Sequence, residues 1–160
     1  MEGYKVASGD LLLFTDADTT HKKSVISFAV SHLLSLELDA LTVIPKMLSL
    51  DGITKITLPM ISTFLHTRFS ALRVNDKAKN TGYFFGSFFI MKKTTYDSVG
   101  TQEGVKSEIV EDGALGKKVK ESNFKMQESL WQVFLEFYFY CLCHSQFLPT
   151  LQLFLIQIRL

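Results

Sequence analysis

The feature that most constrains the fold is a short apolar run that ends in two closely spaced carboxylates. Residues 11–14 read Leu-Leu-Leu-Phe; the turn pair Gly9-Asp10 precedes them, and Asp16-Ala17-Asp18 follows one residue later. An apolar run of this length beside turn residues predicts a buried β-strand. If the extended geometry continues, the side-chain period of two puts Asp16 and Asp18 on the same side of the chain. Paired carboxylates at a strand end suit Mg²⁺ or Mn²⁺, and such a metal could neutralise a diphosphate leaving group.

The same residues also allow a purely structural interpretation. Asp18, Thr19 or Thr20 stands where the N-cap of the next helix is expected, and both aspartate and threonine cap helices well. The spacing of the two aspartates does not decide between a metal site and a helix cap.

The elements after this strand predict an α/β fold. Residues 22–36 carry apolar side chains at helical spacing, which predicts a helix. Residues 40–44 are short and apolar and are closed by Pro45, which favours a strand. Strand, helix and strand in this order imply a right-handed crossover between parallel strands. Further elements are predicted downstream: a strand over residues 84–91, a short helix over 93–99 that Gly100 ends, and a helix over 111–120.

Four motifs follow one another in an order that resembles a known enzyme family. They are residues 3–19 around Asp16-Ala17-Asp18, then Arg73-Val74-Asn75-Asp76, then residues 86–100, then residues 105–115 around Glu111-Asp112-Gly113. This succession resembles the family-2 glycosyltransferases, and within them the membrane-associated branch that includes hopanoid-associated transferases. The resemblance covers about residues 3–126.

The resemblance implies both an architecture and a reaction. Residues 1–126 would form a partial A-type glycosyltransferase domain, Rossmann-like, with a mostly parallel sheet, and residues 127–160 an apolar helical tail. The enzyme would transfer a sugar from a nucleotide-sugar donor to a lipid or membrane-linked acceptor, with inversion at the anomeric carbon and with Mg²⁺ or Mn²⁺ bound. In this family Asp18, supported by Asp16, would hold the metal, and Asp112, with Glu111 beside it, would be the catalytic base.

The assignment of Asp112 as the base has a physical basis in the sequence, and it also has a structural alternative. Asp112 opens a predicted helix, where the helix dipole favours an ionised carboxylate, and Gly113 would leave room for an acceptor chain. The alternative is that Glu111 and Asp112 only stabilise the helix start. His21 would reach the metal or the diphosphate, or else be a capping or solvated histidine.

Gly86 and Ser87 complete the predicted donor site. A glycine before a strand lets the backbone approach a bound sugar closely, although it equally marks a β-bulge. The family pattern also lacks two parts here: its nucleotide-binding strands would precede Gly3, and its arginine-containing segment is matched only poorly by residues 127–131 with Trp131. We therefore expect a fragment of the catalytic domain.

Two apolar segments suggest contact with a membrane. Apolar residues recur every three or four positions over residues 53–72, which is typical of a helix in a membrane interface or of one packed on the domain's own core. Pro59 argues against one straight helix there. The two apolar runs within residues 130–160 each fall short of the ~18–20 residues of a spanning helix, so a poor span, a re-entrant hairpin and a packed helix pair all stay open. Several lysines precede this tail, and no signal peptide is expected, so the catalytic part would face the cytoplasm.

Other functions account for parts of the sequence. Asp16-Ala17-Asp18-Thr19-Thr20 also resembles the nucleophile loop of haloacid-dehalogenase-type phosphatases, in which Asp16 would attack phosphorus and Asp18 would act as general acid–base. A catalytically inactive protein at the membrane surface is the third possibility. The net charge of +1 and the lack of a basic cluster interleaved with aromatics argue against a nucleic-acid partner. Cys141 and Cys143 are interpreted as small buried hydrophobes.

Overall fold

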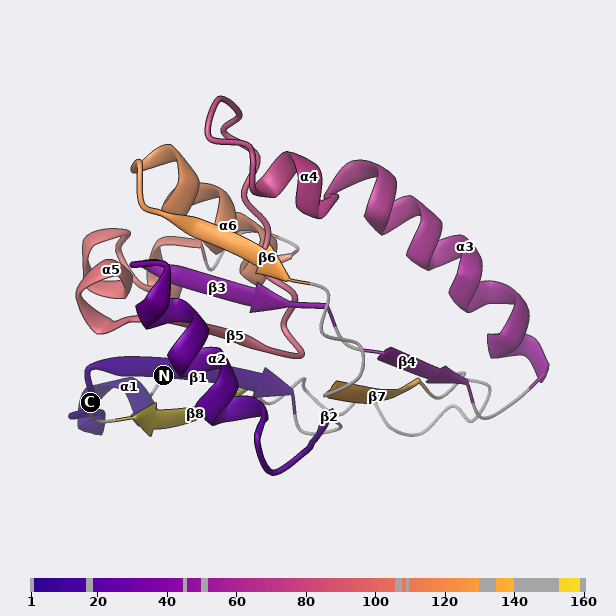
Figure 1. The fold of residues 1–160 in the computed structure, drawn as a ribbon, viewed down its shortest axis with the longest axis horizontal. Helices are drawn as coiled ribbons and strands as arrows, with labels where there is room; N and C mark the ends of the chain where they lie inside the picture. The colour runs from indigo at the N-terminus through magenta and orange to yellow at the C-terminus, as the bar shows by residue number, and fades with distance from the viewer. Residues whose placement is uncertain are drawn as a thin grey trace.

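The computed structural model describes residues 2–16, 19–44, 46–49, 52–105, 108, 110–129, 135–139 and 153–158. The chain has an α/β fold around a central mixed sheet with the strand order β6-β3-β5-β1-β8 (Figure 1). Its strands are β1 (Leu11–Asp16), β3 (Ala40–Val43), β5 (Phe89–Lys92), β6 (Met126–Ser129) and β8 (Leu153–Ile158). The expected strands at residues 11–14 and 40–44 are confirmed, and the strand expected over 84–91 begins later, at Phe89.

The sheet is mostly antiparallel, so the prediction of a mostly parallel sheet was wrong. β5 runs antiparallel to both of its neighbours, with Leu11 opposite Lys92 on β1 and Ala40 opposite Met91 on β3. β1 and β3 therefore run in the same direction, as the predicted strand–helix–strand unit requires, but β5 lies between them. β8 is also antiparallel to β1, and among the described strands of this sheet only β3 and β6 form a parallel pair. The chain turns just before β5, where the Phe88 N–H donates to the Phe85 carbonyl at 3.1 Å.

Helices cover both faces of the sheet. α2 (Val25–Ser35) packs on one face against Leu11 and Leu13, while Leu12 and Phe14 pack on the other face with Tyr96, Leu115 and Val119. The alternation of these leucines follows from the side-chain period of two in a strand. The second face carries α1 (Glu2–Val6), α5 (Lys93–Ser98), the 3₁₀ turn η1 (Gln102–Val105) and α6 (Glu111–Glu121). The helices predicted over residues 22–36, 93–99 and 111–120 thus correspond to α2, α5 and α6. Gly100, just after α5, has a positive φ of 86°.

A stack of aromatic rings ties β1 to β5 on the α6 face. Phe89 lies between Phe14 and Phe84, with ring centroids 4.5 and 4.6 Å apart and interplanar angles of 10° and 7°. All three side chains are almost completely buried. The stack fixes the segment before Gly86 against the sheet, and this segment forms part of the site described below.

α3 (Gly52–Arg68) is a single helix that continues through Pro59, and the short α4 (Ala71–Val74) follows it. The prediction that Pro59 would interrupt the helix was wrong for these residues. Pro59 has no N–H to donate to the preceding turn, yet its own carbonyl accepts a hydrogen bond from Thr63 Oγ1 at 2.7 Å. In Figure 1, α3 extends well beyond the central sheet.

The apolar residues of α3 mostly face away from the protein. Only Thr54 and Leu58 are buried among its described side chains. Four apolar residues at helical spacing form an exposed row that we call the α3 stripe: Ile53, Ile56, Met60 and Phe64, exposed by 55–71%. These side chains are exposed, so the alternative prediction, that this face of the helix packs on the domain's own core, was wrong.

The described parts of the C-terminal region are strands, where an apolar helical tail was expected over 127–160. β6 belongs to the central sheet and crosses the expected boundary at residue 126. β7 (Leu135–Phe139) joins β2 (Thr19–His21) and β4 (Lys46–Ser49) in a second sheet with the order β2-β7-β4. Trp131, Cys141 and Cys143 lie outside the described residues. None of the helices within the described ranges has both the length and the hydropathy needed to cross a bilayer.

Candidate functional site

The first carboxylate of the candidate site lies at the carboxyl end of β1. Asp16 is the last residue of the strand and is only 7% exposed. It follows Leu12 and Phe14 at intervals of two, so its side chain lies on the same face of the sheet as α6. Asp18, the other half of the predicted metal motif, lies outside the described residues.

The second carboxylate comes from the first turn of α6, which a close backbone crossing brings to the same place. A Cβ built on Gly82 would overlap the carbonyl group of Gly116, 2.6 Å from its carbon, and one built on Gly116 would lie 2.7 Å from the Phe84 nitrogen. The absence of side chains at both positions lets residues 82–86 lie directly on α6. This contact points the start of α6, with Glu111 and Asp112, toward the end of β1.

Gly86 lies between the two carboxylates. A Cβ at this position would overlap Asp112 Oδ2 and would lie 3.5 Å from Asp16 Oδ1, so these two oxygens are within about 6 Å of each other. A side chain at residue 86 would therefore displace one carboxylate or both. The structure thus brings together Asp16, Gly86 and Asp112, three residues that the sequence singled out from separate motifs.

The acidity of Asp112 is strongly altered by this arrangement. Burial, together with the negative charges of Asp16 and Glu111, raises the pKa of its carboxyl group to about 6. Glu111 itself is exposed. A carboxylate with a pKa near neutrality is a better proton acceptor than an ordinary aspartate, so the position of Asp112 suits a general base.

A divalent cation fits the chemistry of this pair. Two carboxylates held this close repel each other, and a hard cation with oxygen ligands would offset that repulsion. Asp16 is the described residue best placed to hold it. Among the residues that the structure describes, however, no three His, Cys, Asp or Glu side chains gather as a metal cluster.

An aromatic group that the sequence analysis missed borders the site. Tyr83 stacks on Phe69 with centroids 4.1 Å apart and meets Phe85 edge-on at 5.1 Å. Burial raises the pKa of the Tyr83 hydroxyl, and the charge of Asp112 raises it as well. The run Tyr83-Phe84-Phe85 just before Gly86 was the available signal, because aromatic residues beside a site glycine often line a pocket.

Tyr83 also corrects the interpretation of Gly113. A Cβ on Gly113 would lie 2.6 Å from Tyr83 Cε2. The space beside this glycine is therefore filled by the tyrosine ring and is not left open for an acceptor chain. Glycine is required there because the ring packs directly on the backbone of α6.

His21 and Ser87 belong to a separate hydrogen-bonded group. His21 lies on β2, and its Nε2 is 2.7 Å from Thr15 Oγ1, which in turn donates to the Ser87 carbonyl at 3.0 Å. Thr15 alternates with Asp16 along β1, so this group lies on the α2 side of the sheet. The His21 ring also approaches Phe88, with centroids 5.6 Å apart, and burial lowers the pKa of its imidazole. The described contacts of His21 are thus with Thr15 and Phe88.

The start of α2 shows whether Thr19 or Thr20 caps this helix. The helix begins at Val25, and its N-cap residue is Ser24, without a side-chain capping bond. Thr19 and Thr20 lie in β2, so neither of them caps the helix. The interpretation of His21 as a capping histidine at a helix start was wrong for the same reason.

No protein-family model matches the chain, and a search of the curated proteins finds no match either.

Proposed function

We propose that this chain is the catalytic part of a metal-dependent glycosyltransferase that inverts the anomeric centre of the sugar. The single observation that supports it most is the meeting of Asp16, Gly86 and Asp112 at the end of β1, with Asp112 poised as a base. The four motifs that resemble family-2 glycosyltransferases assign a metal, a donor and a base to these same segments. The donor would be a nucleotide sugar.

The proposed reaction uses the two carboxylates for different tasks. Asp112 takes the proton of the acceptor hydroxyl while its oxygen bonds to the anomeric carbon, and the bond from that carbon to the donor diphosphate breaks. Mg²⁺ or Mn²⁺ held by Asp16, with Asp18, would neutralise the charge on the departing diphosphate. Tyr83, stacked on Phe69, forms an apolar wall next to Asp112 that keeps water from the base.

The acceptor in this proposal is a lipid or a membrane-linked molecule, with the catalytic part on the cytoplasmic side. The α3 stripe supports it, because four exposed apolar residues in a row are costly in water and favourable at a membrane interface. α3 carries Lys55, His66 and Arg68 and no acidic residue, which suits a surface of anionic lipids. Phe69, directly after α3, touches Tyr83, so the stripe leads toward the proposed base.

Isothermal titration with Mn²⁺ and UDP tests the donor site. We expect binding that Asp16→Asn weakens at least about tenfold, since a lost charged ligand costs more than ~1.4 kcal/mol. Glu121→Gln at the far end of α6 is the matched control and should bind like the wild type. Unchanged binding of Mn²⁺ and UDP by Asp16→Asn would contradict the proposal.

Transfer assays with UDP-sugars and a lipid extract test the base. Asp112→Asn should abolish sugar transfer while leaving Mn²⁺–UDP binding intact, and Glu111→Gln should keep most of the activity. Release of phosphate from p-nitrophenyl phosphate, lost in Asp16→Asn, would support the phosphatase alternative instead.

A vesicle assay tests the membrane contact. Co-sedimentation with phosphatidylglycerol vesicles should drop in Ile56→Glu and Phe64→Glu, which place charge within the α3 stripe. Leu34→Glu on α2, another exposed apolar residue, should bind vesicles as the wild type does. Equal loss in all three variants would mean that the stripe has no specific role.

A further inference from the structure

A basic cavity lies at the opposite end of the sheet from Asp16. It has a volume of about 560 Å³ and is formed by the loop after α4, the end of α6 and the start of β6, where Met126 is part of its wall. Asp16 ends β1, which runs parallel to β3, whereas this cavity adjoins the beginning of β6, the parallel partner of β3. The two sites therefore lie at opposite ends of the strands.

The cavity carries more positive than negative charge. Lys77, Lys79, Lys120 and Lys125 line it, and no carboxylate does. Two of these lysines have partners nearby, because Lys79 pairs with Asp76 at 3.6 Å and Lys125 pairs with Glu37 at 3.5 Å. Within the described part of the chain, Lys77 and Lys120 form no ion pair.

Lys120 is the buried member of this group. It is only 8% exposed, although it sits near the end of a helix where lysines are usually solvated. Burial lowers the pKa of its ammonium group, the charge of Asp76 acts in the opposite sense, and the charge of Lys77 lowers the pKa as well. Asp76 pairs with Lys79, so Lys120 is a buried cation that makes no ion pair of its own among the described residues. Such a cation is costly, and a bound anion would offset that cost.

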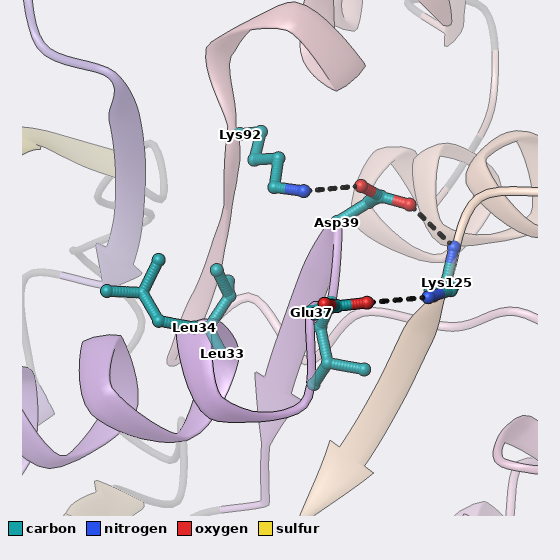
Figure 2. Close-up of a pocket in the computed structure, with 7 residues that line it drawn as sticks. Leu33, Leu34, Glu37, Asp39, Lys92 and Lys125 are labelled. Carbon is teal, nitrogen blue, oxygen red and sulfur yellow. Dashed lines mark hydrogen bonds and ion pairs between the residues drawn. The ribbon is translucent and has the colours of Figure 1, made fainter.

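A neighbouring cavity that shares Lys125 provides an internal comparison. Figure 2 shows that its charged groups satisfy one another: Asp39 accepts from Lys92 Nζ at 2.8 Å and from the Lys125 backbone N–H at 2.9 Å, and Glu37 meets the Lys125 side chain. No positive charge is left over on that side. In the Lys120 cavity, by contrast, Lys77 and Lys120 have no ion pair within the described part of the chain.

The other walls of the Lys120 cavity suit a small molecule. Phe124 and Leu36 provide apolar surface, and Asn80 and Asn123 add amide groups that bond to oxygen. Its volume lies within the range of ~300–1,000 Å³ that is usual for small-ligand pockets.

We propose that this cavity binds a phosphate-bearing molecule through Lys120 and Lys77, at a site separate from the Asp16–Asp112 pair. The phosphate belongs either to a soluble phosphate ester or to the headgroup of an anionic lipid, and both present the same oxygens to the lysines. The inference does not depend on the proposed transferase activity.

The test is titration of the full chain with inorganic pyrophosphate in the presence of EDTA, followed by amide NMR shifts or calorimetry. EDTA removes the divalent cations that an anion at Asp16 would need, so the failure of one site is distinguishable from the failure of the other. We expect saturable binding with shifts around Lys77 and Lys120. Lys120→Gln should weaken it about tenfold, as loss of one charge-assisted hydrogen bond predicts.

Two further variants keep the result interpretable. Lys77→Gln changes an exposed residue of the cavity and should weaken binding even if Lys120→Gln fails to fold. Lys117→Gln lies on the same helix but outside the cavity, paired with Glu121 at 3.7 Å, and should bind as the wild type does. Binding that Lys117→Gln weakens as much as Lys120→Gln, or no saturable binding to either pyrophosphate or vesicles, would overturn the proposal.

Vesicles separate the two sources of the phosphate. If the natural ligand is a headgroup, Lys120→Gln should reduce binding to phosphatidylglycerol vesicles, and pyrophosphate should compete with them. If it is a soluble ester, pyrophosphate should bind while vesicle binding does not depend on Lys120. Either result supports the anion site.

Discussion

At the scale of single residues, Glu128 is the most unusual side chain outside the candidate sites. It lies on β6, is 1% exposed, and neither of its carboxylate oxygens has a hydrogen-bond partner among the described residues. Burial raises the pKa of this carboxyl group from 4.5 to about 7. Because the folded state holds the proton more tightly than the unfolded state, stability is full below about pH 4.5 and is lost as the pH rises toward 7.

Glu128→Gln tests this linkage, because glutamine resembles the protonated acid at every pH. The free energy of unfolding of the variant relative to wild type should rise by up to ~3 kcal/mol between pH 4.5 and pH 8, at 1.36 kcal/mol for each pKa unit. Urea unfolding at both pH values measures it. Glu121→Gln, which changes an exposed glutamate, should give the same difference at both. A pH-independent effect of Glu128→Gln would refute the raised pKa.

The glycine crossing gives a second prediction at this scale. Gly82→Ala should destabilise the protein by about 1–3 kcal/mol, because the new methyl group would overlap the backbone of α6 at Gly116. It should also weaken Mn²⁺–UDP binding, since α6 carries Asp112. Gly52→Ala is the control: no atom lies within 4 Å of its built Cβ, so thermal unfolding should hardly change. Equal stability of the two variants would contradict the observed packing.

The sequence predicted part of this site and could not predict the rest. Asp16 and Asp112 were chosen from their motifs, and the structure brings them within about 6 Å of each other. Tyr83 was missed, and Gly113 was assigned to the acceptor, because both depend on where residues 82–86 cross α6. That crossing joins positions more than thirty residues apart through bare backbone, which leaves no periodic pattern in the sequence.

At the scale of elements, the periodic segments were predictable and the strand directions were not. Short apolar runs located β1 and β3, apolar residues at helical spacing located α2, and charged residues suited to the helix dipole located α6. The side-chain period of two describes parallel and antiparallel strands alike. The sequence alone therefore did not indicate that β5 runs antiparallel to both β1 and β3.

α3 provides a prediction about an element that continues through a proline. Pro59 is exposed within the helix and removes one backbone hydrogen bond from it. Pro59→Ala should therefore raise the free energy of unfolding by about 1–2 kcal/mol, after allowing for the freedom that the unfolded chain regains. Urea unfolding and helical circular dichroism measure it. A less stable variant would mean that the helix is bent at this point to fit its neighbours.

At the scale of the whole molecule, α3 has fewer buried contacts than the central sheet. The sheet is covered by α2 on one face and by α5 and α6 on the other. α3 has only two buried side chains and reaches outward from this body (Figure 1). Local stability follows the number of buried apolar contacts, so α3 should open more readily than the sheet.

Amide hydrogen exchange followed by mass spectrometry measures this difference. Exchange in α3 should be at least about tenfold faster than in β1 and β5, which corresponds to ~1.4 kcal/mol of local stability. Phosphatidylglycerol vesicles should slow exchange in α3 and leave β1 unchanged. Uniform protection of α3 and the sheet would show that the helix is held by contacts of equal strength.

The Asn75 carboxamide bears on how this protein behaves among other copies of itself. Its Nδ2 donates to the Glu128 carbonyl at 3.0 Å, and its Oδ1 accepts from the Glu128 N–H at 2.7 Å. β6 is the outermost strand on its side of the sheet, and an open strand edge is a template for aggregation. One side chain thus imitates a peptide group of a further strand and occupies the middle of that edge. A polymerising neighbour would have to displace the carboxamide before it could add to the sheet.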